Sequence, residues 1–165
     1  MGSKFNVYGL FFACLLGINV QAADVVEVKG IGMDLARDIA DEAVKACKAQ
    51  GYNVSAVVVD RHGLLRVALR DDLAARFTLQ IAEQKANAAI MSGIDSGVFR
   101  ESRKDIRQEM NHVEGILMMV GGVVINAGGY RIGAVGVSGA PGGEKDEVCA
   151  KAALGKLQER LEFAE

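Results

Sequence analysis

The stretch GGVVINAGGYRIGAVGVSGAPGGEKD, from Gly121 to Asp146, decides the fold class of this chain. Two β-prone runs flank Gly128-Gly129, and a Gly-Gly pair between such runs predicts a hairpin because both turn positions favour positive φ. The second run contains three glycines. Glycine weakens a strand interior, so the run indicates that a helix, another subunit or a ligand approaches its backbone closely. A loop of small residues, Ser138–Gly143, then leads into the acidic start of a helix.

Outside this hairpin, the hydrophobic pattern predicts further helices and strands. The expected helices are Met33–Gln50, Leu73–Met91, Phe99–Asn111 and Glu144–Phe163, and the expected strands are Val54–Val59, Leu64–Arg70 and Gly115–Val120. A turn at Asp60–Gly63 joins the first two strands as a second hairpin. Because the strands come mainly in hairpins, we expect an α+β fold with a mainly antiparallel five-stranded sheet flanked by helices.

The N-terminal segment has the pattern of a secretory signal peptide. Lys4 precedes an apolar run, Val7–Val20, that is too short for a comfortable membrane span, and Val20-Gln21-Ala22 has small residues at the cleavage positions. We therefore expect residues 1–22 to be removed and residues 23–165 to form one domain. The mature protein is expected to be periplasmic or extracellular, with no membrane association after signal cleavage.

Composition narrows the classes of partner. Half of the residues are hydrophobic and the formal net charge is −2, which gives no electrostatic basis for binding nucleic acid. A small domain this apolar is expected to bury surface against copies of itself as a homo-oligomer. Cys47 and Cys149 remain after signal removal. An oxidising compartment allows them to form a disulfide, but their apolar neighbours in predicted helices favour buried free thiols.

Catalytic motifs are scarce in this sequence. No pair of histidines or cysteines has the spacing of a metal site, and there is no nucleophile elbow. Gly133–Gly139 lies within a predicted strand and does not open a helix, so we reject dinucleotide binding. Asp60, Asp72 and His112 supply acid–base groups, but nothing in their spacing demands that they meet.

Two kinds of candidate binding group remain. The backbone amides of Ser138–Gly143, at the positive end of a helix dipole, suit a carboxylate, propionate or phosphate, although the acidic first turn fits an ordinary capping loop equally well. The two histidines are the other candidates. His62 lies in a hairpin turn. His112 ends the charged helix near several methionines, and haem iron accepts imidazole together with thioether. A helix-end histidine on terminal carbonyls, with methionines as core filler, is the competing interpretation.

Three blocks of sequence resemble the GlcG/HbpS-like family, whose domain is described as haem-binding or haem-degrading and also ends some PduO-type corrinoid adenosyltransferases. The blocks are Val57–Asp60 with Gly63, Arg70 and Asp72; Ala82–Ala89, with its Lys85-Ala86 pair; and Gly121–Ile125 with Gly133–Gly139 and Asp146. The third block is the most specific. Together the three blocks span nearly the whole expected domain.

The resemblance implies a profilin-like domain that forms oligomers and binds a small molecule, often haem, in some members beside a signalling partner. Three positions depart from the family pattern. Val124 replaces a usual proline, His62 replaces the first glycine of the first turn, and Leu64 stands where a histidine is often found. No family haem ligand is therefore carried over, and His112 and His62 are the candidate metal ligands by residue type alone.

These observations predict an exported, homo-oligomeric protein that binds haem or a related tetrapyrrole as a carrier or sensor, beside a signalling or transport partner. The predicted ligand-binding residues are Arg70, Lys85, Gly121, Gly122, Ser138 and Gly139. Arg70 and Lys85 are expected to receive carboxylates, as charged groups make the stronger hydrogen bonds. The alternatives are an enzyme that degrades haem or acts on a small hydroxy acid or aldehyde, and a structural protein without a ligand. No catalytic residue is assigned.

Overall fold

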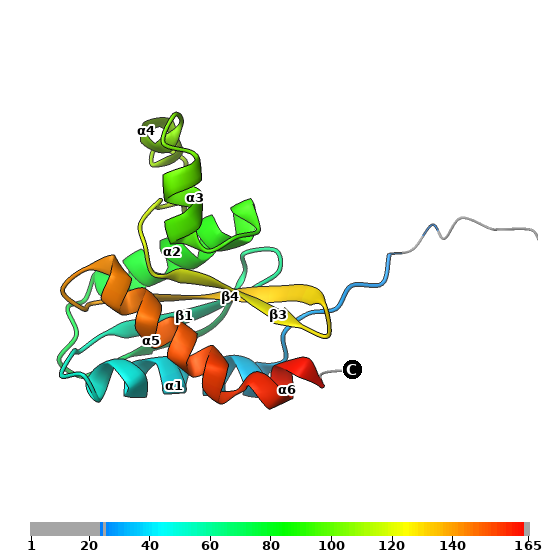
Figure 1. Cartoon of the computed structure of the whole chain (residues 1–165), viewed down its shortest axis with the longest axis horizontal. Coiled ribbons are helices and arrows are strands. Elements are labelled where there is room, and N and C mark those ends of the chain that lie inside the picture. Colours follow the sequence, from blue (N-terminus) through cyan, green and yellow to red (C-terminus); the bar gives the residue numbers. More distant parts are fainter. Residues whose placement is uncertain (1–23, 25, 164–165) are drawn as a thin grey trace, which may run out of the picture.

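The computed structural model describes residue 24 and residues 26–163, so the expected signal peptide lies outside the described residues. The elements follow the chain as α1 Met33–Lys48, β1 Ser55–Asp60, β2 Leu65–Arg70, α2 Thr78–Ser92, α3 Ser96–Ser102, α4 Arg107–Met110, β3 Gly122–Ala127, β4 Tyr130–Ser138, α5 Gly143–Lys156 and α6 Gln158–Glu162. Their arrangement is α+β, with helices against both faces of a sheet (Figure 1).

The sheet is antiparallel, with four strands in the order β2-β1-β4-β3. The expected hairpin at Gly128-Gly129 is confirmed. Ala127 pairs with Tyr130 across these glycines, whose φ angles are 53° and 82°. The first hairpin is confirmed as well, with Ala56 opposite Leu69. The central strands β1 and β4 thus lie between the edge strands β2 and β3, and most of their residues are buried.

The fifth strand that we expected at Gly115–Val120 is wrong. The backbone N–H of Leu117 donates to the carbonyl of Gln84 on α2 (3.3 Å), and that of Met118 donates to Oδ1 of Asn111 (2.9 Å). These groups are therefore satisfied by a helix and a loop instead of a neighbouring strand. An apolar run alone does not distinguish a strand from a buried loop.

Helices cover the two faces of the sheet unequally. On one face α1, α5 and α6 enclose the larger core, in which Ile39, Val58 and Val137 are fully buried. On the other face α2 lies alone, with its alanines against Val57 and Val59. Figure 1 shows α1 and α5 on the side of the sheet opposite to α2.

Glycines let α2 lie directly on the sheet. A Cβ at Gly136 of β4 would overlap the carbonyl oxygen of Ala82, and one at Gly122 of β3 would overlap the carbonyl oxygen of Lys85. Because packed interiors leave no spare room, any side chain at these positions would push the helix away. The close neighbour that the glycine-rich strand predicted is therefore, at Gly136, the helix α2.

Between α2 and β3 the chain forms an arm, Ser96–Ile116, that projects from the body (Figure 1). We expected one helix at Phe99–Asn111, but the structure has two short helices, α3 and α4. Helical geometry ends at Arg103, whose φ and ψ are −123° and 48°. The expected C-terminal helix is likewise divided, into α5 and α6.

The two cysteines are buried, as the sequence indicated, but the expectation of free thiols is wrong. Cys47 of α1 and Cys149 of α5 form a disulfide with a Cα–Cα distance of 5.3 Å. Both residues are fully inaccessible to solvent. The sequence showed the apolar surroundings of each cysteine but not that α1 and α5 lie side by side.

Candidate functional site

A pocket of about 330 Å³ lies where the β1–β2 turn, the C-terminal half of α2 and the end of the arm meet. Its lining is His62, Gly63, Asn87, Ile90, Met91, Glu114, Gly115 and Ile116. We call it the His62 pocket. Its walls combine apolar side chains with a few polar groups, which is the usual composition of a small-molecule site. It also brings an imidazole and a thioether to one place.

The turn that carries His62 is built by Asp60. Oδ1 of Asp60 accepts hydrogen bonds from the backbone N–H groups of His62 (2.8 Å) and Leu64 (3.0 Å). Gly63 supplies the positive φ of 81° that the turn needs. The Asp60 carboxylate is thus occupied by the backbone, and the His62 side chain is left exposed beside the pocket.

Asn87 of α2 lines the pocket next to this turn. Its Nδ2 donates to the carbonyl of Gly115 at 3.2 Å. Its Oδ1 is buried and accepts no hydrogen bond, and among the described residues it is the only buried side-chain nitrogen or oxygen without a partner. A buried acceptor without a hydrogen bond carries a desolvation penalty, so a donor that reached this oxygen would stabilise it.

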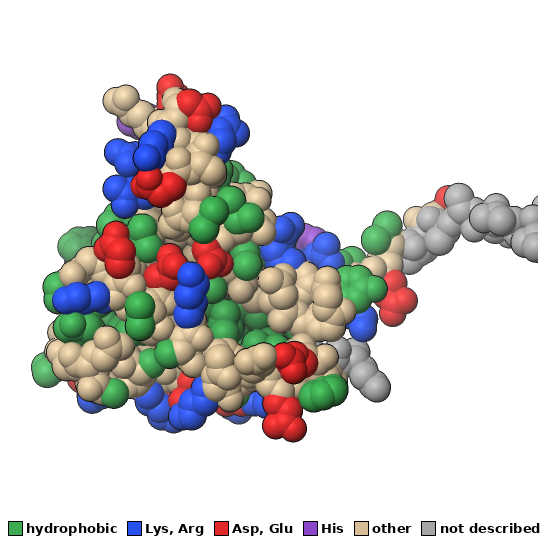
Figure 2. Space-filling model, in the orientation of Figure 1, with side chains coloured by type: hydrophobic (Ala, Val, Ile, Leu, Met, Phe, Trp, Pro, Cys, Tyr) green, Lys and Arg blue, Asp and Glu red, His purple; other side chains and the backbone are tan. Residues whose placement is uncertain are grey.

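A cation lies at the edge of this region. The guanidinium of Arg131, at the start of β4, covers Gly93, where a Cβ would overlap its Nη1. Gly93 caps α2 only two residues after Met91. Arg131 is exposed. Figure 2 shows Lys and Arg atoms beside histidine on the flank of the molecule near the β1–β2 turn. No sequence pattern indicated Arg131, because only the fold joins position 131 to the end of α2.

Lys85 lies inside the protein, not on the helix surface. Its side chain is 1 % exposed, and its ammonium donates to Oδ2 of Asp146 (2.8 Å) and to the carbonyl of Val137 (3.0 Å). Asp146, on α5, is equally buried. Burial raises the pKa of the Asp146 carboxyl, and the Lys85 ammonium opposes that rise. The pair joins α2, β4 and α5 at the centre of the fold.

The same carboxylate organises the loop Ser138–Gly143. Oδ1 of Asp146 accepts the backbone N–H of Ala140 at 2.9 Å, so a side chain of this protein supplies negative charge to that loop. Gly139 has φ of 135° and lies against the backbone of Asn53. These contacts are those of a capping loop, one of the two interpretations of this segment.

The predicted ligand-binding residues therefore divide into groups. Gly121 lies against the buried pair, since a Cβ there would be 3.0 Å from Nζ of Lys85. Gly122 lies against the backbone of Lys85. Ser138 and Gly139 directly follow Val137, whose carbonyl accepts from the Lys85 ammonium, so they are also near the pair. Arg70, at the end of β2, lies two strands from Ser138 in the same row of the sheet, across Ser55 of β1, and its guanidinium donates to the carbonyl of Ala74 (2.6 Å).

The two histidines are separated in the structure. His112 follows α4 in the arm, is exposed, and donates its backbone N–H to the carbonyl of Glu109 (3.0 Å). It is not part of the His62 pocket. Among the described residues, no three side chains of His, Cys, Asp or Glu are grouped as a metal site.

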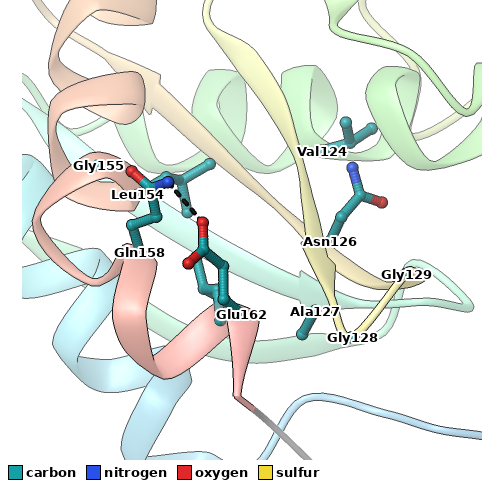
Figure 3. Close-up of a pocket in the computed structure, with 10 residues that line it drawn as sticks. Val124, Asn126, Ala127, Gly128, Gly129, Leu154, Gly155, Gln158 and Glu162 are labelled. Carbon is teal, nitrogen blue, oxygen red and sulfur yellow. Dashed lines mark hydrogen bonds between the residues drawn. The ribbon is translucent and has the colours of Figure 1, made fainter.

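Two of the larger pockets have different chemistry from the His62 pocket. One, of about 580 Å³, lies between the β3–β4 hairpin and the helices α5 and α6. Figure 3 shows Asn126 and Val124 on one side and the hydrogen-bonded Gln158 and Glu162 on the other. A second, of about 600 Å³, lies between α3 and α5 and includes Glu101 and Glu147. Neither lining contains a histidine or a cation.

These features define a class: a small α+β domain with a partly apolar pocket at one end of its sheet. The comparison of sequence gives the family. Residues 31–155 match the family described as haem degrading protein HbpS-like, and the chain belongs to this family. A search of curated proteins finds no match.

Solved structures agree with this assignment. The crystal structure of HbpS is 29 % identical, with a TM-score of 0.77 over 85 % of this chain and 99 % of that one. The Klebsiella pneumoniae protein ORFY is 24 % identical, with a TM-score of 0.76 over 84 % of this chain and 97 % of that one. PduOC, solved as a haem complex, is 22 % identical, with a TM-score of 0.66 over 76 % of this chain and 94 % of that one. The last two likenesses show the fold.

Proposed function

We propose that this protein is an exported, oligomeric binding protein for haem or a related tetrapyrrole, and that it acts as a carrier or sensor. The observation that carries the proposal is the His62 pocket, in which an imidazole and a thioether lie among apolar side chains. Membership of the HbpS-like family and the haem complex of PduOC support the choice of ligand.

The residues of the pocket fit haem by their chemistry. His62 and Met91 are residue types that hold haem iron, and Ile90 and Ile116 offer apolar surface to a macrocycle. Bound haem would supply an iron centre that takes axial ligands and changes its redox state. Met91 in the lining is 47 % exposed, and Leu64, outside it in the adjoining turn, is 64 % exposed, so apolar surface extends beyond the pocket. A second copy of the chain would cover the part of the ligand that a pocket of this size leaves open.

The propionates belong on the side of Arg131. Glu114 lines the pocket and would repel a carboxylate, whereas the exposed guanidinium of Arg131 suits one. Lys85 already binds Asp146, and Arg70 lies at the opposite end of β2. Arg131 therefore takes the role that the sequence suggested for those two residues.

Two observations support export. The disulfide between Cys47 and Cys149 is typical of proteins in oxidising compartments. The N-terminal sequence has the pattern of a signal peptide. In the described part of the chain, no helix combines the length and the hydropathy that a membrane span requires.

The ligand assignment is tested by titrating residues 23–165 with haemin and following the Soret band. Wild type is expected to give a saturable, stoichiometric shift. His62→Ala should weaken binding roughly 100-fold, or about 2.8 kcal/mol, since the axial imidazole is lost. His112→Ala is the matched control and should bind as wild type does. Equal affinity of His62→Ala and wild type, or a selective loss in His112→Ala, would overturn the assignment.

The role of Arg131 is tested with the same assay. Arg131→Ala should lower haemin affinity by about 10- to 100-fold, since a hydrogen bond to a charged group is worth ~1.5–3 kcal/mol. The dimethyl ester of haemin lacks the propionate charges and should bind Arg131→Ala and wild type equally. Arg70→Ala serves as a control that removes one guanidinium far from the pocket. If Arg70→Ala loses affinity and Arg131→Ala does not, the propionates lie elsewhere.

A further inference from the structure

The unpartnered oxygen of Asn87 has a defined direction. Because a carbonyl oxygen only accepts hydrogen bonds, the amide group that meets Gly115 must be Nδ2, and this contact at 3.2 Å fixes the side-chain orientation. Oδ1 therefore points the other way. There it is buried and, among the described residues, it alone of the buried side-chain polar atoms lacks a partner.

That direction leads to the β1–β2 turn. A Cβ built on Gly63 would lie 3.3 Å from Oδ1 of Asn87, so the acceptor lies against the residue that follows His62. His62 and Asn87 line the same pocket. The imidazole of His62, the residue before Gly63, is exposed and carries a ring N–H that can donate a hydrogen bond.

We propose that Asn87 is the positioning residue for His62. Its Oδ1 accepts a hydrogen bond from one ring N–H of His62, which leaves the other ring nitrogen unprotonated and directed at the ligand. A histidine that binds a metal almost always donates its second N–H to an acceptor, and that bond fixes the tautomer and the ring orientation. This inference rests on the proposed function for the identity of the ligand, but the proposed hydrogen bond between His62 and Asn87 does not require a bound ligand.

Glu114 is the competing acceptor. It lines the same pocket, yet its side chain is exposed and belongs to the arm. Water satisfies an exposed carboxylate, whereas Oδ1 of Asn87 is buried and gains more from a donor. The proposed bond also requires glycine at position 63, because a Cβ there would lie 3.3 Å from Oδ1 of Asn87 and crowd it.

The test measures the tautomer of His62 in the haem-free protein from its ring ¹⁵N chemical shifts at a pH where the ring is neutral. Wild type should show one dominant tautomer at His62, while exposed His112 serves as the internal reference. Asn87→Leu should return His62 to the tautomer ratio of His112. Asn87→Asp loses the bond to Gly115 as Leu does but keeps an acceptor, so it should restore the dominant tautomer.

Haemin titration of the same variants gives the second readout. Asn87→Leu should bind haemin about 10- to 100-fold more weakly than wild type while keeping the Soret position of His62 ligation. Asn87→Asp should recover most of that affinity. Thermal unfolding shows that each variant is folded. The inference is overturned if His62 of wild type has the tautomer ratio of His112, or if Asn87→Leu keeps the wild-type ratio. Failure of wild type to bind haemin would instead overturn the proposed function and leave the tautomer result standing.

Discussion

Replacing Lys85 by Met is expected to lower the free energy of unfolding by about 3–5 kcal/mol, which is the usual cost of removing one partner from a buried ion pair. Met keeps most of the length of the side chain but leaves the Asp146 carboxylate, 3 % exposed, without its ammonium. The carbonyl of Val137 loses its donor at the same time. Urea unfolding followed by circular dichroism measures the effect.

The matched control separates the pair from general damage to the core. Lys85→Met with Asp146→Leu removes both charges, and replacing a whole buried ion pair with apolar groups is often far less costly than breaking it. The double variant should therefore be more stable than Lys85→Met alone. Lys151→Met, which removes a half-exposed cation from α5, should change stability by less than about 1 kcal/mol. If the double variant lost as much free energy of unfolding as the two single variants together, the two residues would not be a coupled pair.

The pH dependence of stability is a further measure of the same ion pair. Burial raises the pKa of Asp146 above its ordinary value of 3.8, and Lys85 opposes that rise. A carboxyl whose pKa is raised on folding contributes most to stability below its unfolded pKa and loses that contribution as pH rises through the folded pKa. In Lys85→Met, no ammonium opposes the rise in the pKa of Asp146. The difference in free energy of unfolding between wild type and Lys85→Met should thus be small near about pH 3 and grow toward about pH 7.

Removing the disulfide is expected to lower the free energy of unfolding by about 2–5 kcal/mol. The bond closes a sequence separation of 102 residues, and a long loop confers a large entropic constraint on the unfolded chain. The variant Cys47→Ala/Cys149→Ala avoids burying new polar atoms in the two helices. Guanidinium unfolding with and without a reductant measures the loss.

Wild type under reducing conditions is the control for this prediction. It should match the double-alanine variant, and the reductant should leave that variant unchanged. Wild-type stability that does not respond to the reductant, while mass spectrometry shows two free thiols, would contradict a stabilising bond between α1 and α5.

The local patterns of the sequence predicted most of the fold. Regular periodicity located α1, and the Gly-Gly pair at 128 and 129 located the β3–β4 hairpin. The errors fall where periodicity is weak. Leu73 does not belong to α2, because its N–H binds Oδ1 of Asp71 (3.2 Å) in a turn before the helix begins at Thr78. The apolar run 115–120 before β3 was predicted to be a strand. Its backbone N–H at Leu117 instead donates to the carbonyl of Gln84 on α2.

The candidate site was harder to predict than the fold. The family resemblance selected Lys85 and the glycines around 121 and 139, and the structure brings these together, but around a buried ion pair. The pocket joins positions 62, 87 and 114, which no local pattern relates. Asn87 lay in a recognised sequence block, yet the absence of a partner for its Oδ1 is visible only in three dimensions.

The central claim, that haem binds in the His62 pocket, is tested most directly by adding haemin to ¹⁵N-labelled protein and following its amide spectrum. The paramagnetic iron broadens nearby signals first. The account predicts early loss of the signals of Gly63, Asn87 and Gly115, with those of Gly128 and Gly129 beside the larger pocket retained. Early loss at Gly128 and Gly129, or at His112 in the arm, with the Gly63 signal unchanged, would contradict it.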